Sequence, residues 1–218
     1  MSRISLFEFK VEQSIREIAN SLLKKRYAPS MKSGFMLVKA DNESIIAKHI
    51  TEVISERTIT SPFGDTEVSL VKDYLVNEIE VRSGLIKVID PTKSLSQFKQ
   101  DLSSALNYLC SISPLNVDLK KFVGVIHEND GITVTAIEIM SQELMTDTTA
   151  RMSIASSNCL MSRVSEYLEG KSYTIKKLKI DIHGVGTAEL NSKGNIKLDD
   201  KPDQKHLYNV LRDNILSE

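Results

Sequence analysis

Hydrophobic and polar positions follow their clearest pattern between residues 78 and 110. Residues 78–82 read Glu-Ile-Glu-Val-Arg, and this period of two predicts a half-buried strand. Ser-Gly at 83–84 predicts a tight turn or a bulge. The denser apolar run 85–89 then predicts a strand that is covered on both faces. This strand ends before Pro91, because proline has no N–H to donate to a sheet.

The stretch from Ser94 to Cys110 has the period of an amphipathic helix. Ser94 followed by Gln97 predicts a capping box at its start. The apolar side of this helix consists of Leu95, Phe98, Leu102, Ala105, Leu106 and Leu109. One strand-and-helix unit buries such a stripe only against a sheet, so we expect the rest of the chain to supply one.

Apolar spacings of three and four also predict helices over residues 5–26, 145–169 and 206–216. Ser5 and Glu8 form a capping box for the first of them. The first and second helices have long apolar faces, which is typical of helices that pack on a partner or on a second copy.

Alternating or β-branched runs predict strands over 35–40, 122–127, 132–140, 173–182, 185–190 and 195–198. Asp-Gly before residue 132 and the segment 191–194 predict hairpin turns, because glycine tolerates positive φ. Residues 44–60 and 66–76 are ambiguous. Their apolar spacing suits a helix and their β-branched residues suit a strand, and we favour strand for part of 44–60.

These elements together predict an α+β fold with mostly antiparallel sheet packed against four or so helices. The length of 218 residues allows one unit over 1–218. It also allows a subdivision into 1–110 and 115–218 around a hinge at 111–114.

Composition excludes few functions. The net charge is −1, so no bulk electrostatic attraction to nucleic acid or to an anionic membrane is expected. No apolar run approaches the roughly 20 residues of a membrane span, and no signal peptide is recognisable at the start, so we expect no membrane partner. Cys110 and Cys159 both fall in predicted helices and predict reduced structural thiols in a cytoplasmic protein. The abundance of Lys, Ile, Ser and Asn is typical of bacterial or phage proteins.

No catalytic motif stands out. The four histidines lack metal-binding spacing. The glycines after His183 lack the third glycine of a dinucleotide loop, since Glu189 occupies that place. The sequence therefore predicts no cofactor, and it leaves open whether the protein is an enzyme, with the absence of motifs favouring a non-enzyme.

The nearest approach to a metal-dependent nuclease site is Asp73 with Glu78 and Glu80. Such a site needs carboxylates for Mg²⁺ and a lysine that orients water, and Arg82 stands where that lysine would be. Alternating charge is equally typical of the solvent face of a strand, so no metal site is predicted outright.

Two groups of cations are candidates for nucleic-acid binding. They are Lys24, Lys25 and Arg26, and a second group of Lys171, Lys176, Lys177, Lys179, Lys193 and Lys197. The triplet also suits the negative end of a helix dipole. The second group also suits a sheet edge guarded by lysine. The scarcity of aromatic neighbours disfavours a stacking platform for bases.

The leading hypothesis from sequence is a non-enzymatic interaction or assembly subunit of a cytoplasmic complex, with a protein partner or a second copy. The alternative is a nucleic-acid-binding or nuclease-associated component that acts through the lysine-rich surface. A third possibility is a small-molecule enzyme whose pocket is assembled from dispersed residues.

Overall fold

The computed structural model describes residues 2–127, 131–145, 148–156, 158–160, 164, 166, 169–170, 172–199, 208–209, 211–212 and 215. Contacts divide the chain into two compact units. Unit 1 consists of Met1–Leu6 and Pro114–Glu218, and unit 2 consists of Phe7–Ser113. Strand β1 (Ser2–Val11) runs from the first unit into the second.

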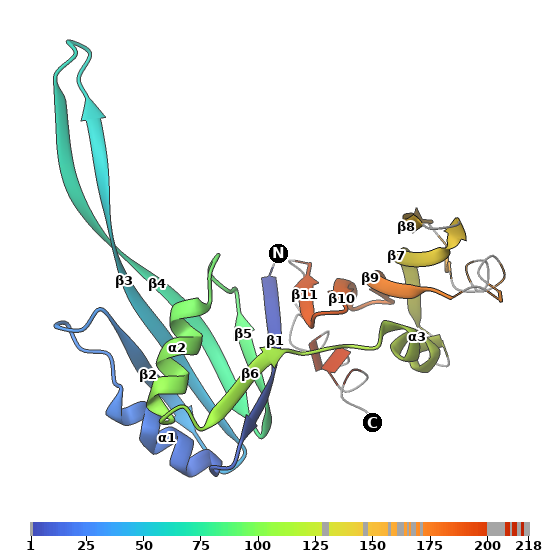
Figure 1. The fold of residues 1–218 in the computed structure, drawn as a ribbon, viewed down its shortest axis with the longest axis horizontal. Coiled ribbons are helices and arrows are strands. Elements are labelled where there is room, and N and C mark those ends of the chain that lie inside the picture. The colour runs from blue at the N-terminus through green and yellow to red at the C-terminus, as the bar shows by residue number, and fades with distance from the viewer. Residues whose placement is uncertain are drawn as a thin grey trace. The chain divides into compact units, whose positions relative to one another are not determined.

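Unit 2 combines an antiparallel sheet with two helices (Figure 1). Its further elements are α1 (Ile15–Lys24), β2 (Ser33–Ala40), β3 (Ser44–Thr60), β4 (Thr66–Arg82), β5 (Gly84–Ile89), α2 (Ser96–Ala105) and β6 (Cys110–Pro114). The strand order is β2-β3-β4-β5-β1, and β6 also pairs with β1.

Alternation along β3 separates the two faces of this sheet. Ile45, Ala47 and His49 are buried, whereas Ile46 between them is exposed. The buried side chains join the core that α1 and α2 supply, with Phe98 as a central member. The helices therefore cover one face of the sheet in unit 2 and leave the other open.

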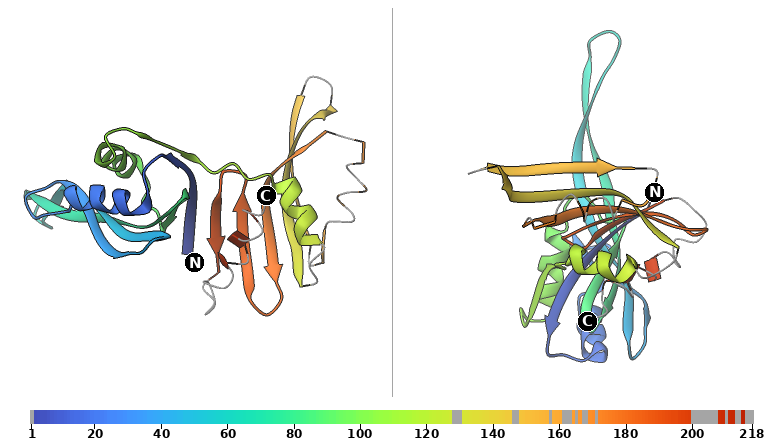
Figure 2. Two further views of the ribbon diagram at one scale, coloured as in Figure 1. Left: turned by 90° about the horizontal axis from the view of Figure 1, so that it is seen from below. Right: turned by 90° about the vertical axis from the view of Figure 1, so that its right-hand side faces the viewer.

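Unit 1 places one helix on a second stretch of antiparallel sheet (Figure 2). Its elements after β6 are α3 (Leu119–His127), β7 (Ile132–Met145), β8 (Thr148–Ala155), β9 (Thr174–Ile182), β10 (Gly186–Asn191) and β11 (Asn195–Leu198). The strand order is β1-β11-β10-β9-β7-β8. Phe122 of α3 is buried, as are Leu178 and Ile180 of β9.

The predicted α+β class with four or so packed helices is wrong. The described residues contain eleven strands and three helices, and the strands dominate. Among those residues, no helix is long and apolar enough to cross a membrane.

The helix predicted over 5–26 is strand β1 followed by α1. Ile4 through Phe7 are buried without interruption, so this strand shows no period of two that would identify it. The capping box of this helix lies nine residues after the predicted one at Ser5 and Glu8. Ser14 and Glu17 form it, with the Ser14 N–H donating to Glu17 Oε2 at 2.8 Å.

Two other predictions fail for related reasons. The strand predicted over 122–127 belongs to α3, because its apolar run also suits a buried helix. The helix predicted over 145–169 is replaced in its first part by β8, which pairs with β7. Most residues of the helix predicted over 206–216 lie outside the described part. Neither cysteine lies in a described helix, and both are free thiols.

The remaining strands are confirmed, and the ambiguous segments 44–60 and 66–76 are both strand. Helix α2 is confirmed as well, although its N-cap is Leu95 and makes no side-chain cap. The hydroxyls of Ser94 and Ser96 bond each other at 2.8 Å, and Gln97 donates to Asp101. The capping box predicted at Ser94 and Gln97 is therefore wrong.

Candidate functional site

The β3–β4 hairpin extends far beyond the rest of unit 2 (Figure 1). The register of the hairpin is unbroken from Ser44, opposite Arg82, to Thr60, opposite Thr66. Strand β2 accompanies β3 only to Thr51, and β5 accompanies β4 only from Glu78 onward. Residues 53–75, called the arm below, are therefore a ribbon of two strands and a turn.

A five-residue turn closes the arm. The Ser61 N–H donates to the Asp65 carbonyl at 2.8 Å, and the Ser61 hydroxyl accepts from the Phe63 N–H at 3.2 Å. Gly64 has a φ of 91°, which residues with a side chain rarely adopt. Phe63 at the tip is 93% exposed.

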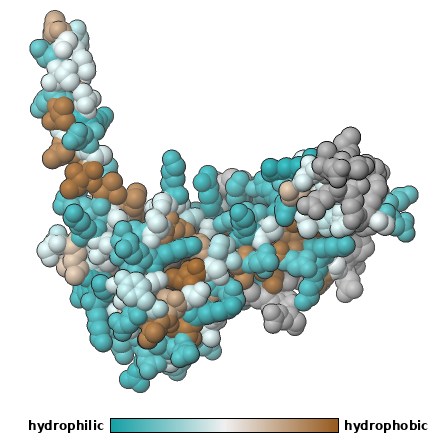
Figure 3. Space-filling view, in the orientation of Figure 1, coloured by the Kyte–Doolittle hydropathy of each residue, from teal (hydrophilic) through white to brown (hydrophobic). Residues whose placement is uncertain are grey.

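Large apolar side chains line the arm in contact with solvent (Figure 3). The antiparallel register puts even-numbered residues of both strands on one face and odd-numbered residues on the other. Exposed apolar residues of the even face of the arm are Ile54, Val68, Leu70 and Tyr74, and those of the odd face are Val53, Ile59 and Leu75. Leu70 is 72% exposed and Val68 is 59% exposed. A ribbon so rich in exposed apolar groups is a candidate interaction surface.

The three metal-ligand candidates do not converge. Asp73 lies on the odd face of the hairpin, opposite Val53, whereas Glu78 and Glu80 lie on the even face. Glu78 forms an ion pair with Lys48 at 3.0 Å. Among the residues that the structure describes, no three metal-binding side chains form a cluster.

Glu80 is held by two cations instead. It pairs with Lys87 at 2.5 Å and with Arg82 at 2.7 Å. Burial favours the protonated carboxyl, but the hydrogen bonds to Lys87 and Arg82 outweigh it and lower the pKa of Glu80. Arg82 thus neutralises a carboxylate, which is a structural role rather than the water-orienting role of a nuclease lysine.

The cationic triplet lies at the end of α1. Lys24 is in the last turn, Lys25 is the C-cap, and Arg26 forms an isolated bridge with Phe35. All three residues are exposed. Cations at this end favour the negative pole of the helix dipole, and the triplet belongs to unit 2 rather than to the unit of the other lysines.

The lysines of unit 1 lie on adjacent strands. Glu189 of β10 stands between Lys197 of β11 and Lys179 of β9 in one cross-strand row. Lys177 occupies the next such position on β9, opposite Glu138 of β7. Lys193 lies in the β10–β11 turn, while Lys171 lies outside the described residues. Strands β9 to β11 are interior in the strand order, so these lysines do not guard a sheet edge.

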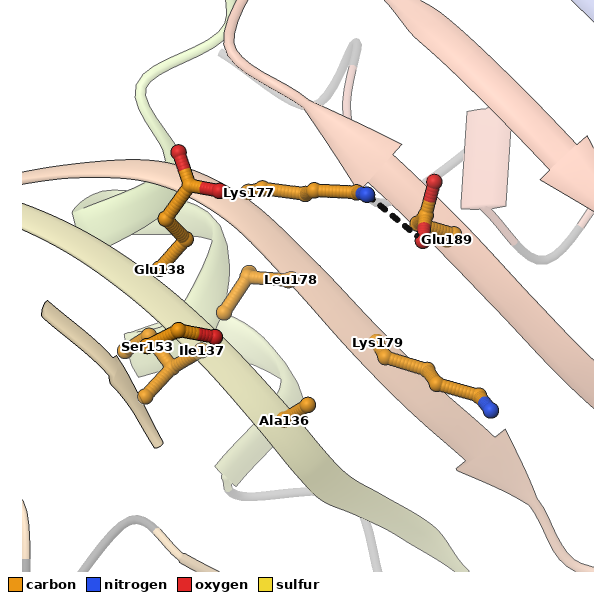
Figure 4. A pocket seen from close by; sticks show the side chains of 8 residues that line it. All are labelled: Ala136, Ile137, Glu138, Ser153, Lys177, Leu178, Lys179 and Glu189. Atoms are coloured by element: carbon orange, nitrogen blue, oxygen red, sulfur yellow. Dashed lines mark ion pairs between the residues drawn. The ribbon is translucent and has the colours of Figure 1, made fainter. Parts of the chain in front are cut away.

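Two carboxylates are set among these cations. Lys177 Nζ lies 2.7 Å from one oxygen of Glu189 (Figure 4). Lys197 Nζ lies 3.0 Å from the other oxygen. Burial favours protonation of Glu189, but the hydrogen bonds to these lysines lower its pKa. Glu138 pairs with Arg151 at 2.8 Å. Glu189 is therefore ionised near neutral pH, and both carboxylates hold cations in place.

A shallow groove of 540 Å³ runs over this part of the sheet. Its lining comprises Glu138, Met140, Arg151, Lys176, Lys177, Glu189, Asn191, Ser192, Lys193 and Lys197. A smaller pocket of 160 Å³ adjoins it and includes Lys179 (Figure 4). We call Arg151, Lys176, Lys177, Lys179, Lys193 and Lys197 the basic sheet face.

One buried pair lies away from both surfaces. His49 Nε2 lies 2.8 Å from Asp101 Oδ2, and the His49 ring is fully buried against Phe35 and Phe98. In the part of the chain that the structure describes, Asp101 is the one hydrogen-bond partner of this ring, and no hydroxyl or thiol bonds it. The pair joins β3 to α2 and has a structural role.

The sequence indicated part of these surfaces. The lysines are recognisable from their clustering in the sequence, but Arg151 falls in the helix predicted over 145–169, and no sequence signal distinguishes Glu138. The arm was missed as a unit. Its signal was available in two β-branched runs on either side of Ser61-Pro62-Phe63-Gly64-Asp65, which is the arrangement of a long hairpin.

No protein-family model matches the chain, and a search of curated proteins finds no similar sequence.

Proposed function

We propose that this protein is an assembly subunit that associates with a second copy of itself through the arm. The observation that carries the proposal is the ribbon over residues 53–75, which presents large exposed apolar side chains on both faces. Burial of such side chains in an interface contributes roughly 25 cal/mol per Å² of apolar surface. Their exposure in the single chain therefore leaves free energy that association can gain.

The isolation of the arm supports an occupant that supplies further strands. A hairpin of two strands is marginally stable in water and gains stability from a third strand or a packed surface. Both strands of the arm have edges that no other described strand covers. An uncovered edge offers a row of N–H and C=O groups to another chain.

The sequence of β4 favours a second copy as that chain. In an antiparallel pairing of two β4 edges about a two-fold axis at Val71, Val68 faces Tyr74 and Leu70 faces Lys72. No like charges oppose each other over 66–76 in this register. If the axis is centred at residue 70, Glu67 faces Asp73 of the second copy. If it is centred at residue 72 or 73, Lys72 faces Lys72 or Asp73 faces Asp73. Each arrangement brings like charges together and is unfavourable.

The hairpin register also fixes the geometry of this pairing. Ser61 donates to Asp65, so odd-numbered residues direct their backbone groups into the hairpin and even-numbered residues direct theirs outward. Val71 would then face Val71 of the second copy as a pair without backbone hydrogen bonds. The Cα separation in such a pair is about 4.5 Å, which a disulfide spans.

Cysteine cross-linking tests this arrangement. In a chain whose Cys110 and Cys159 are replaced by serine, Val71→Cys is expected to form a disulfide between copies under mild oxidation. Ser69→Cys is the matched control, because Ser69 shares the face but would face Asp73, about 13 Å from its own copy. Cross-linking of neither variant, or of both equally, would contradict the two-fold pairing.

A polar substitution tests the apolar contribution separately. Leu70→Gln removes an exposed apolar group and adds no charge opposite Glu56 or opposite Lys72 of the second copy, so folding is expected to be preserved. Association should weaken at least tenfold. Ser55→Gln adds the same side chain to the odd face of the arm and is expected to change association less. Equal effects of the two variants would indicate that the apolar side chains of the even face do not control association.

A further inference from the structure

Apolar and charged side chains alternate along β9, β10 and β11, so they lie on opposite faces of the sheet. Leu178, Ile180, Leu190, Ile196 and Leu198 are all buried in the core of unit 1. Their neighbours Lys177, Lys179, Glu189 and Lys197 point to the other face. One side of this sheet is thus the core, and the other is a surface of charged side chains.

A bulge increases the cation density of this surface. Glu138 faces Lys177 and Ile139 faces Ile175, so Lys176 is the extra residue on β9. Lys176 and Lys177 are consequently both half-buried rather than on opposite faces of the sheet. Both side chains line the same groove.

Charge does not cancel on this surface. Among the described residues that line the two adjoining pockets, the six cations of the basic sheet face stand against two carboxylates, Glu138 and Glu189. Four positive charges therefore remain among these residues, although the whole chain carries −1. The excess is local and cannot be read from the composition.

We infer that the basic sheet face binds the phosphate backbone of a nucleic acid. Charge complementarity supports this occupant, because phosphate chains are the densest polyanions that a protein meets. The amide of Asn191 and the hydroxyl of Ser192 line the groove beside the cations, and both groups commonly donate to phosphate oxygens. This inference is independent of association through the arm.

Other occupants fit the surface less well. A protein interface normally has an apolar centre, and Met140 is the one large apolar side chain that lines the groove in the described part. The lining residues that the structure describes include no aromatic ring either. Bases therefore have nothing to stack on, and recognition rests on the backbone and is independent of sequence.

Salt dependence gives the first test. Full-length protein is titrated into labelled duplex DNA and labelled single-stranded RNA of mixed sequence. Four phosphate contacts give a slope of log K against log salt of about −3.6 for the duplex. Affinity is then expected to fall about 100-fold between about 50 and 200 mM salt. Absence of binding at the lower salt concentration overturns the inference.

Matched substitutions give the second test. Lys179→Gln with Lys193→Gln removes two cations from the basic sheet face and should reduce the slope by about 2. Lys24→Gln with Lys25→Gln removes the same charge at the end of α1 and should leave the slope unchanged. An equal loss in both pairs would mean that net charge alone governs binding, which overturns the assignment.

Glu189→Gln tests the face in the opposite direction. The change removes the carboxylate that holds Lys177 and Lys197, so nucleic-acid affinity is expected to rise. This gain cannot arise from misfolding. Unchanged or weaker binding, or equally tight binding to poly-glutamate or to anionic lipid vesicles, would contradict a site for nucleic-acid phosphates.

Discussion

Acidification should destabilise unit 2 through His49. Its ring is fully buried between Phe35 and Phe98. Nε2 bonds Asp101, but Nδ1 is buried with no hydrogen-bond partner among the described residues. Protonated histidine carries an N–H on both nitrogens, so the folded protein favours the neutral ring with its proton on Nε2. Burial accordingly lowers the pKa of His49, against the opposing effect of Asp101.

The sign and size of the effect follow from proton linkage. The ordinary histidine pKa is 6.5, so the unfolded chain takes up a proton below this pH while the folded protein resists it. The stability contributed by His49 is complete above pH 6.5 and decreases as the pH falls toward the lower folded pKa. The loss reaches at most about 1.4 kcal/mol at about pH 5.5.

Urea unfolding of wild type and His49→Gln measures this loss. Glutamine does not titrate, and its amide can donate to Asp101 as Nε2 does. The difference between the two proteins cancels the contribution of the carboxylates. Between about pH 7.5 and 5.5, the free energy of unfolding of the wild type should fall by up to about 1.4 kcal/mol more than that of the variant. Parallel pH profiles, or a wild type that gains stability over the variant on acidification, would refute a buried neutral histidine.

Three substitutions test the packing of unit 2 by thermal or urea unfolding. Ser14→Ala removes the capping box shared with Glu17 and should cost about 1 kcal/mol, and an unchanged midpoint would contradict a helix start at Ser14. Gly34→Ala places a Cβ 2.8 Å from the backbone of Tyr27, so a loss of about 1–3 kcal/mol is expected. Leu102→Ala empties part of a fully buried site and should cost about 2–5 kcal/mol, whereas a loss below about 1 kcal/mol would contradict its central place in the core.

Sequence patterns predict strands well where one face of the strand is exposed to solvent and the other is buried. The alternation around Ile79 and Val81 predicts the last part of β4, and the interruption at Gly84 predicts the turn to β5. They failed where both faces are buried. In β1, continuous burial removes the alternation, and the spacing from Phe7 to Ile18 joined a strand and a helix into one false stripe.

The candidate surfaces were predictable only in part, because each depends on strand neighbours far apart in sequence. Lys177 and Glu189 are close because β9 and β10 pair, and Glu138 joins them across β7. The arm depends on something the local sequence does not encode, namely where β2 and β5 stop accompanying the hairpin. The exposure of Leu70 follows from that limit rather than from its neighbours in sequence.

Replacement of the arm tests the central claim most directly. Val53 and Asp73 face each other in the register, so an Asn-Gly turn can join them in place of residues 54–72 and leave the core of unit 2 intact. The molar mass of both proteins is measured by light scattering over a range of concentrations. The full chain is expected to be a dimer, and the shortened chain is expected to be a monomer whose circular dichroism spectrum still shows folded β-sheet. A full chain that remains monomeric, or a shortened chain that still dimerises, would contradict assembly through the arm.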